Sequence, residues 1–173
     1  MKKIVIYILL LVIYLLMIKQ VVYSFDVFYD AIFIVLILLF FVFMYCVYIK
    51  NRLMQIITYI IWLLFLLFYR KAQNGVNFDF YLLDWIKHIG TNKTIFVNIV
   101  GNIIIFILLG YYFRNILLGL LIIVTLEALQ YYTGRGMFDV VDIFLNLLGY
   151  FIGSLGVYLW IITKKKRKIE KKK

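Results

Sequence analysis

Apolar residues along the chain are gathered in long blocks that short polar stretches separate. The blocks span about residues 4–24, 27–49, 53–69, 94–113, 116–132 and 138–162. An α-helix rises about 1.5 Å per residue, so roughly 17–25 apolar residues are enough to cross the ~30 Å hydrocarbon layer of a membrane. The pattern therefore predicts an all-α fold, an integral membrane bundle of about six transmembrane helices.

The longest polar break lies between the third and fourth blocks, at residues 70–93. Helical spacing in its middle places five apolar or aromatic residues on one face, namely Phe78, Tyr81, Leu82, Trp85 and Ile89. Trp and Tyr favour the interface between membrane and water. The sequence thus predicts a short interfacial helix at 78–89 on the outer side, although Phe80 and Leu83 interrupt the pattern.

Composition supports a membrane protein without a separate soluble domain. Hydrophobic residues make up 66% of the chain and its mean hydropathy is +1.04, whereas soluble domains are nearer half apolar. The blocks divide the chain into N-terminal helices at 1–70, a core with the outer loop and three helices at 71–162, and a basic cytoplasmic tail at 163–173. The single cysteine, Cys46, can form neither an internal disulfide nor a metal cage, so it is expected to be a packing residue.

Basic residues are distributed unequally between the two ends of the predicted spans. With a cytoplasmic N-terminus, thirteen of the 19 Lys and Arg residues fall inside, and six fall outside: Lys19, Arg70, Lys71, Lys87, Lys93 and Arg135. Because Lys and Arg favour the cytoplasmic side, both termini are predicted to be cytoplasmic. The tail KKKRKIEKKK directly follows a span and is expected to touch anionic lipid. Nothing else typical of nucleic-acid binding accompanies it, so no nucleic acid is expected as a partner.

Polar residues interrupt the last three blocks, where they are costly to place in lipid. Counting about 1.5 Å per residue from the predicted outer ends puts all of them within about 12 Å of the outer surface. The predicted polar cluster consists of Asn98, Asn102, Glu127, Gln130, Asp139, Asp142 and Asn146, with Arg135 in the turn between the last two spans.

The polar residues of each span also lie on one face of the helix. At about 100° per residue, one side of the last span carries Asp139, Asp142, Asn146, Gly149 and Gly153. The two glycines form a GxxxG pair, which lets a neighbouring helix approach closely. The fourth span has a similar stripe of Asn98, Gly101 and Asn102, and the fifth has one of Glu127, Gln130 and Tyr131. Three polar stripes at one level predict a pocket that opens to the outside.

A purely structural role is the alternative for several of these side chains. Asp139 and Asp142 lie where carboxylates cap the first turn of a helix. Asn98 and Asn102 are residues of the kind that hold helices together in membranes. Glu127 is harder to explain by packing, because an ionisable residue inside a span usually faces a cavity or a partner.

The same residues resemble the VanZ-like membrane protein family. The resemblance rests on NIVGNIIIFILLG at 98–110, followed by Glu127, Gln130, Gly134, Arg135, Asp139, Asp142, Asn146 and Gly149. It covers about residues 74–160, and the chain has Leu108 where the family usually has a proline. The family is associated with lowered susceptibility to teicoplanin, a lipoglycopeptide that acts on lipid-linked wall precursors at the outer membrane face. The resemblance therefore implies antibiotic resistance at the cell membrane, with such a precursor or the lipoglycopeptide as partner.

Two functions of different classes remain open, so the sequence does not decide whether the protein is an enzyme. In the first, the cluster binds a lipid headgroup or an amphiphile, Arg135 contacts an anion, and neither metal nor cofactor is needed. In the second, Glu127, Asp139 and Asp142 are catalytic acids and bases acting on a phosphate- or sugar-bearing lipid. Only this second function would involve a divalent metal, which carboxylate oxygens would hold.

Overall fold

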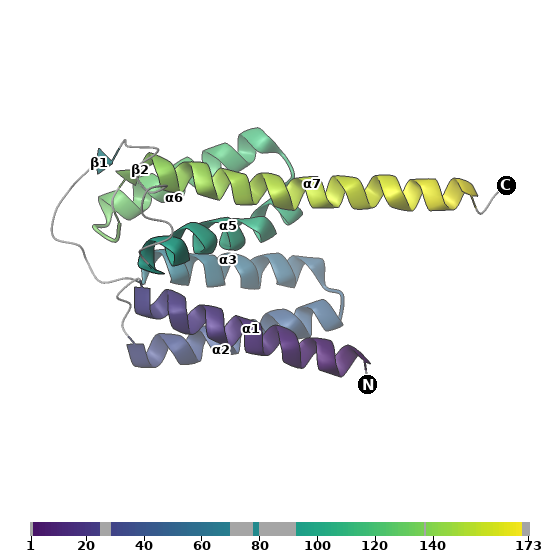
Figure 1. Ribbon diagram of the computed structural model, residues 1–173, viewed down its shortest axis with the longest axis horizontal. Coiled ribbons are helices and arrows are strands. Elements are labelled where there is room, and N and C mark those ends of the chain that lie inside the picture. The colour runs from purple at the N-terminus through teal and green to yellow at the C-terminus, as the bar shows by residue number, and fades with distance from the viewer. Residues whose placement is uncertain (1, 25–28, 70–77, 80–92, 137, 171–173) are drawn as a thin grey trace.

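The described part of the chain is almost entirely helical. The computed structural model describes residues 2–24, 29–69, 78–79, 93–136 and 138–170 (Figure 1). Its helices and strands are α1 (Lys2–Ser24), α2 (Tyr29–Tyr48), α3 (Arg52–Phe68), β1 (Phe78–Asp79), α5 (Lys93–Phe113), α6 (Ile116–Tyr132), β2 (Phe138–Asp139) and α7 (Val140–Glu170). Each apolar block predicted from the sequence corresponds to one of these helices, which confirms the all-α fold class.

Helix α7 differs most from its predicted bounds. It runs on to Glu170, eight residues beyond the predicted end at 162, and projects past the other helices (Figure 1). The extension consists mainly of Lys, Arg and Glu, which have high helix propensity. Adding such residues to an existing helix avoids the cost of nucleating a new one. The basic tail therefore continues the helix as far as the described residues go.

Two helices are long and apolar enough to cross a membrane. These are the stretches Ile95–Phe113 of α5 and Val140–Arg167 of α7. The other described apolar stretches, Ile8–Gln20, Ile32–Tyr48, Arg52–Phe68 and Ile116–Tyr132, have 17 residues or fewer. The prediction of six spans therefore stays a prediction for those four helices.

Helices α5 and α7 form the most closely packed pair in the described residues. A Cβ atom on Gly149 would fall on the carbonyl group of Ile103, and one on Gly153 would fall on that of Ile107. Gly110 of α5 meets the backbone of α7 in the same way, at Tyr150. The GxxxG pair thus permits direct backbone contact, as predicted, and the neighbouring helix is α5.

The hydrophobic core joins all of the helices through large buried side chains. Tyr59 of α3 and Tyr150 of α7 are almost completely buried. The Tyr59 hydroxyl donates to the carbonyl of Ile105 at 2.8 Å, and the Tyr150 hydroxyl donates to that of Asn115 at 2.6 Å. These bonds remove the cost of burying a hydroxyl group in apolar surroundings. Cys46 is also buried and free, in agreement with a packing role.

The two ends of the bundle are built differently. One, the strand end, holds β1, β2 and the turn from α6 to α7, where Gly134 has a φ of 66° (Figure 1). The other, the loop end, holds the tight connections 49–51 and 114–115 (Figure 1). Helices α5 and α7 both run from the strand end to the loop end, whereas α6 runs the opposite way. The polar half of each of these three helices therefore lies at the strand end.

Candidate functional site

The predicted polar residues of α5, α6 and α7 gather at the strand end. Asn98 and Asn102 lie in the first half of α5, and Glu127 and Gln130 lie in the last turns of α6. Three further members lie at or near the start of α7: Asp139, Asp142 and Asn146. Glu127, Asn102, Gln130 and Asn146 are all buried. These residues therefore lie at one level of the bundle. Their role in binding a ligand stays a prediction.

A short hydrogen bond joins the polar faces of α5 and α7. The side-chain nitrogen Nδ2 of Asn102 donates to Oδ1 of Asp142 at 2.6 Å. Bonds to an ionised carboxylate are shorter and stronger than bonds between neutral groups. Because the contacts of Gly149 and Gly153, about two and three turns further along α7, hold the two backbones together, this half-buried bond has a fixed position.

Two buried amide oxygens flank this bond. Oδ1 of Asn98 and Oδ1 of Asn146 are buried, and neither accepts a hydrogen bond within the described part of the chain. Asn98 lies one turn before Asn102, and Asn146 lies one turn after Asp142. A buried acceptor without a donor costs about 1–3 kcal/mol. Such a cost is recovered when water or a ligand supplies the donor.

Gln130 has a different structural role from its neighbours. Its Nε2 donates to the backbone carbonyl of Leu67 at 3.2 Å, which ties the end of α6 to the end of α3. The backbone carbonyl of Gln130 accepts a hydrogen bond from the Arg135 backbone N–H at 2.8 Å, and this bond closes the turn after α6. Gly136 packs against the Gln130 side chain. These contacts assign Gln130 at least a structural function that the sequence pattern did not indicate.

Asp139 and Asp142 also differ from each other. Oδ1 of Asp139 accepts a bond from the backbone N–H of Val141 at 2.7 Å, so this carboxylate caps the first turn of α7. Asp142, less than one turn later, instead meets Asn102 across the interface. The structural alternative considered for both residues thus applies to Asp139, while Asp142 belongs to the contact between α5 and α7.

Residues 78–79, the described part of the predicted outer loop, reach this cluster through a pair of two-residue strands. β1 pairs with β2 in parallel, with Phe78 opposite Phe138 and Asp79 opposite Asp139. The prediction of a helix starting at 78 is therefore wrong for residues 78–79, because their backbone groups pair with β2 instead of with a helical turn. Residues 80–89 of that prediction, with Trp85 and His88, lie outside the described residues. The pairing places residues 78–79 at the start of α7, next to the polar cluster.

The described residues offer no ready metal centre. No three His, Cys, Asp or Glu side chains in this part of the chain come together as metal ligands would. Carboxylate oxygens are the ligands that Mg²⁺ and Ca²⁺ prefer, usually with several from one site. The divalent metal of the enzyme hypothesis therefore has no support from the part of the chain that is described.

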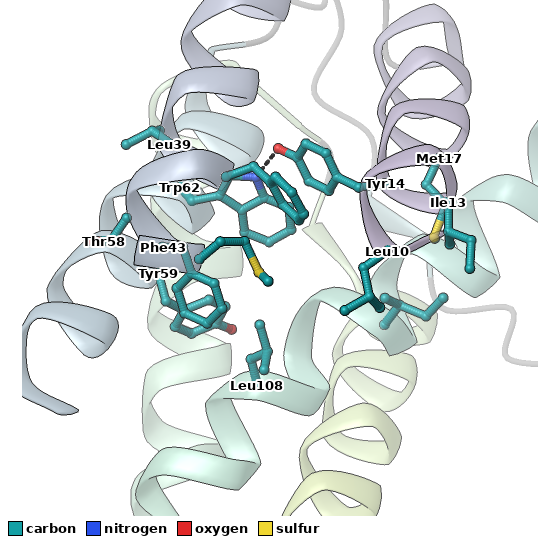
Figure 2. Close-up of a pocket in the computed structure, with 13 residues that line it drawn as sticks. Leu10, Ile13, Tyr14, Met17, Leu39, Phe43, Thr58, Tyr59, Trp62 and Leu108 are labelled. Atoms are coloured by element: carbon teal, nitrogen blue, oxygen red, sulfur yellow. Dashed lines mark hydrogen bonds between the residues drawn. The ribbon is translucent and has the colours of Figure 1, made fainter. Parts of the chain in front are cut away.

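An apolar cavity of about 320 Å³ lies between α1, α2, α3 and α5 (Figure 2). The Trp62 indole N–H donates to the Tyr14 hydroxyl at 2.9 Å, and that hydroxyl donates to the Leu36 carbonyl at 2.7 Å. The sequence pattern of residues 1–70 indicates only apolar helices, so it did not predict this cavity. The available signal was the presence of Tyr14 and Trp62 within apolar blocks, which is equally typical of packing.

Comparison with known protein families gives a match over most of the chain. The family model described as VanZ/LLP1 matches residues 28–163. Comparisons with curated proteins and with solved structures give no significant match. The matched segment begins before α2 and extends through most of α7, so it contains every residue of the predicted polar cluster. Since it covers well over half of the 173 residues, the chain belongs to the VanZ/LLP1 family.

Proposed function

We propose that this protein crosses the cell membrane with six helices and binds a polar headgroup at the outer face through the polar cluster. The surface of the bundle supports the first part, because large apolar side chains are exposed on every helix. Leu117 is 75% exposed, Leu53 is 67% exposed and Ile34 is 60% exposed. A soluble protein rarely shows contiguous apolar surface on this scale, whereas lipid tails would cover it at no cost.

The charges at the loop end support a cytoplasmic position for that end. Lys50, Arg52 and Arg114 lie there, and the projecting part of α7 carries Lys164, Lys165, Lys166, Arg167 and Lys168. Lys and Arg next to membrane spans favour the cytoplasmic side. On this proposal both termini are cytoplasmic, and the strand end with its polar cluster faces the outside of the cell.

The observation that carries the binding function is the pair of buried oxygens on Asn98 and Asn146. Both are acceptors, so a matching ligand must bring N–H or O–H donors. The carboxylates of Glu127 and Asp142 add negative charge at the same level, which favours hydroxyl, amide or ammonium groups. A lipid-linked wall precursor or a lipoglycopeptide carries such donors. We infer that a ligand of this class is bound and that binding contributes to teicoplanin resistance.

The enzyme alternative is less well supported by the contacts. A catalytic acid or base needs a carboxylate oxygen within reach of the substrate. One oxygen of Asp142 is engaged by Asn102, and one oxygen of Asp139 caps α7. Both contacts position these residues structurally, which favours binding over catalysis.

Substitution of Asn146 by leucine tests the proposed function. Leucine has a similar shape but no acceptor, so Asn146→Leu removes the unpaired oxygen without opening a cavity. We expect protein purified in mild detergent to lose its co-purified ligand, and cells expressing the variant to lose teicoplanin resistance, while thermal stability stays equal or rises. Gln130→Leu is a comparison variant within the same cluster: it breaks the bond to Leu67, so it should lower the melting temperature, which Asn146→Leu should not.

Mass spectrometry separates the two candidate functions. Wild-type protein incubated with the lipid-linked precursor should return the precursor with its mass unchanged if the protein binds it. A product of altered mass would favour the enzyme. Full ligand retention and full resistance in Asn146→Leu would contradict the proposed site.

A further inference from the structure

A second cavity, of about 850 Å³, lies at the loop end, far from the polar cluster. It is bounded by the connection from α2 to α3, the second half of α5 and the middle of α7. Its volume is within the range of about 300–1,000 Å³ that is typical of sites for small ligands.

Three cationic side chains line this loop-end cavity, namely Lys50, Arg52 and Arg114. They come from both tight connections at this end and from the start of α3. No Asp or Glu is among the described residues that line it. The cavity is therefore complementary to an anion, and two arginines offer the planar geometry that suits phosphate oxygens.

The backbone of the two connections has the same unusual design. Lys50 has a φ of 57° and Arg114 has a φ of 49°, in the left-handed region that favours glycine. Each is followed by an asparagine that caps the next helix: Asn51 accepts from the Met54 N–H at 3.1 Å, and Asn115 accepts from the Leu117 N–H at 3.1 Å. Glycine would fit both positions with less strain. Both connections instead carry a cation at this position, and both cations line the same cavity.

Hydrogen bonds fix the polar part of the wall. The Tyr112 hydroxyl of α5 donates to Oε1 of Gln55 in α3 at 3.0 Å, and Nε2 of Gln55 donates to the Cys46 carbonyl of α2 at 3.1 Å. This chain of bonds ties three helices together beside the cations. The charged end of the cavity is thus held in place before any ligand arrives.

The remainder of the lining is apolar, which distinguishes this cavity from a simple anion site. The apolar lining comes from Ile107 and Leu108 of α5 and from Ile152, Val157 and Ile161 of α7. Gly156 also lines the cavity, and no atom lies within 4 Å of the place where its Cβ would be, so this part is open. Trp160 stands at the rim, with the Lys164 ammonium 4.8 Å from its ring centroid. Cationic at one end and apolar along its length, the cavity matches an amphiphile.

We propose that the loop-end cavity binds an anionic phospholipid of the inner leaflet, with its phosphate between Arg52 and Arg114 and an acyl chain along α5 and α7. This inference rests on the membrane orientation proposed above but not on the ligand of the polar cluster. Basic sites between helices on the cytoplasmic side are suited to anionic headgroups. The phosphate chemistry is shared by free phosphate, and the apolar lining favours the lipid.

Binding to purified full-length protein in detergent tests the site without depending on orientation. Phosphatidylglycerol, phosphatidylcholine and inorganic phosphate are titrated separately, and binding is measured by native mass spectrometry and by the rise in melting temperature. We expect phosphatidylglycerol to bind more tightly than phosphatidylcholine, and inorganic phosphate to have little effect at equal concentration. If inorganic phosphate stabilised the protein as much as phosphatidylglycerol does, the cavity would be a phosphate site and not a lipid site. This result would overturn the proposal.

Two double variants distinguish lipid binding in this cavity from non-specific attraction of anionic lipid to the basic tail. The double variant Arg52→Gln, Arg114→Gln should bind phosphatidylglycerol about 30-fold more weakly. Each substitution removes the contribution that a single Lys or Arg typically makes to the binding of an anionic lipid. Lys165→Gln with Lys166→Gln removes the same charge from the tail and should bind like the wild type. Equal losses in the two double variants, or no loss in the first, would overturn the proposal.

Gly156→Leu provides a test that keeps every charge, should the arginine variant fail to fold. The leucine side chain would fill the open apolar part of the cavity, so phosphatidylglycerol binding should fall. The ligand of the polar cluster, whose binding depends on Asn146, should be retained. Unchanged phosphatidylglycerol binding in Gly156→Leu would contradict the site. Loss of both ligands at the two ends would also contradict it, because the two sites are proposed to be independent.

Discussion

Substitution of Gly149 by alanine should separate α5 from α7 and destabilise the protein. The new Cβ would lie 2.9 Å from the carbonyl carbon and 3.0 Å from the Cα of Ile103, and closer still to the carbonyl oxygen. These are backbone atoms of a helix, so they cannot rotate away as a side chain can. Overpacking of this kind typically costs about 1–3 kcal/mol. Part of this cost is offset by the higher helix propensity of alanine, about 1 kcal/mol relative to glycine.

Gly156→Ala is the matched control on the same helix. No atom lies within 4 Å of the Cβ position at Gly156, so alanine adds helix propensity without a clash. The two variants therefore differ by the clash alone, about 1–3 kcal/mol. For a chain of this size that corresponds to a difference in melting temperature of roughly 2–12 °C.

Thermal unfolding in detergent, followed by circular dichroism, measures this difference. We expect Gly149→Ala to melt below Gly156→Ala, and binding by the polar cluster to weaken, because the bond between Asn102 and Asp142 depends on the same interface. Equal melting temperatures for the two variants would refute the conclusion that α5 and α7 touch through their backbones at Gly149.

Three further predictions address the polar contact, the topology and the strained connections. Asn102→Ala should destabilise the protein by about 1–3 kcal/mol and more than the double variant with Asp142→Ala, because the single change removes the donor that Asn102 supplies to the half-buried Asp142 carboxylate; chemical denaturation of both measures this, and equal stability would contradict it. Cysteines introduced at Asn74 and Glu170 in a cysteine-free background should react with an impermeant reagent from outside and inside respectively, and labelling of both from one side would exclude the proposed topology. Lys50→Gly should raise the melting temperature of lipid-free protein, since glycine relieves a positive φ worth about 1 kcal/mol, and should weaken phosphatidylglycerol binding; a lower melting temperature would contradict the strain.

The helices could be predicted closely because their boundaries are encoded locally. Long apolar blocks set their lengths, and the polar pairs Lys50–Asn51 and Arg114–Asn115 mark the connections between them. The contact between α5 and α7 was also predictable in part, since GxxxG spacing on a helix face has a direct steric meaning. The sequence could not name the partner helix, because spacing on one helix says nothing about its neighbour.

The features that were missed depend on residues far apart in the chain. β1 and β2 pair across about sixty residues, and a two-residue strand has no periodicity of its own. Gln130 shares a helix face with Glu127, yet it bonds to Leu67, whose carbonyl is available only because α3 ends there. The loop-end cavity likewise brings together residues of three segments whose separate patterns are those of ordinary connections and apolar helices.

The length of α7 has a mechanical consequence. Its 31 residues form one continuous rod about 46 Å long, held about a third of the way along by the backbone contacts of Gly149 and Gly153. Counted from the midpoint between these two glycines at about 1.5 Å per residue, Asp142 lies about 14 Å toward one end and Glu170 lies about 28 Å toward the other. A tilt of α7 that displaces Asp142 by about 1 Å would therefore displace the basic end by about 2 Å in the opposite direction. The helix has the proportions of a lever whose short arm carries the polar cluster and whose long arm carries the cationic tail.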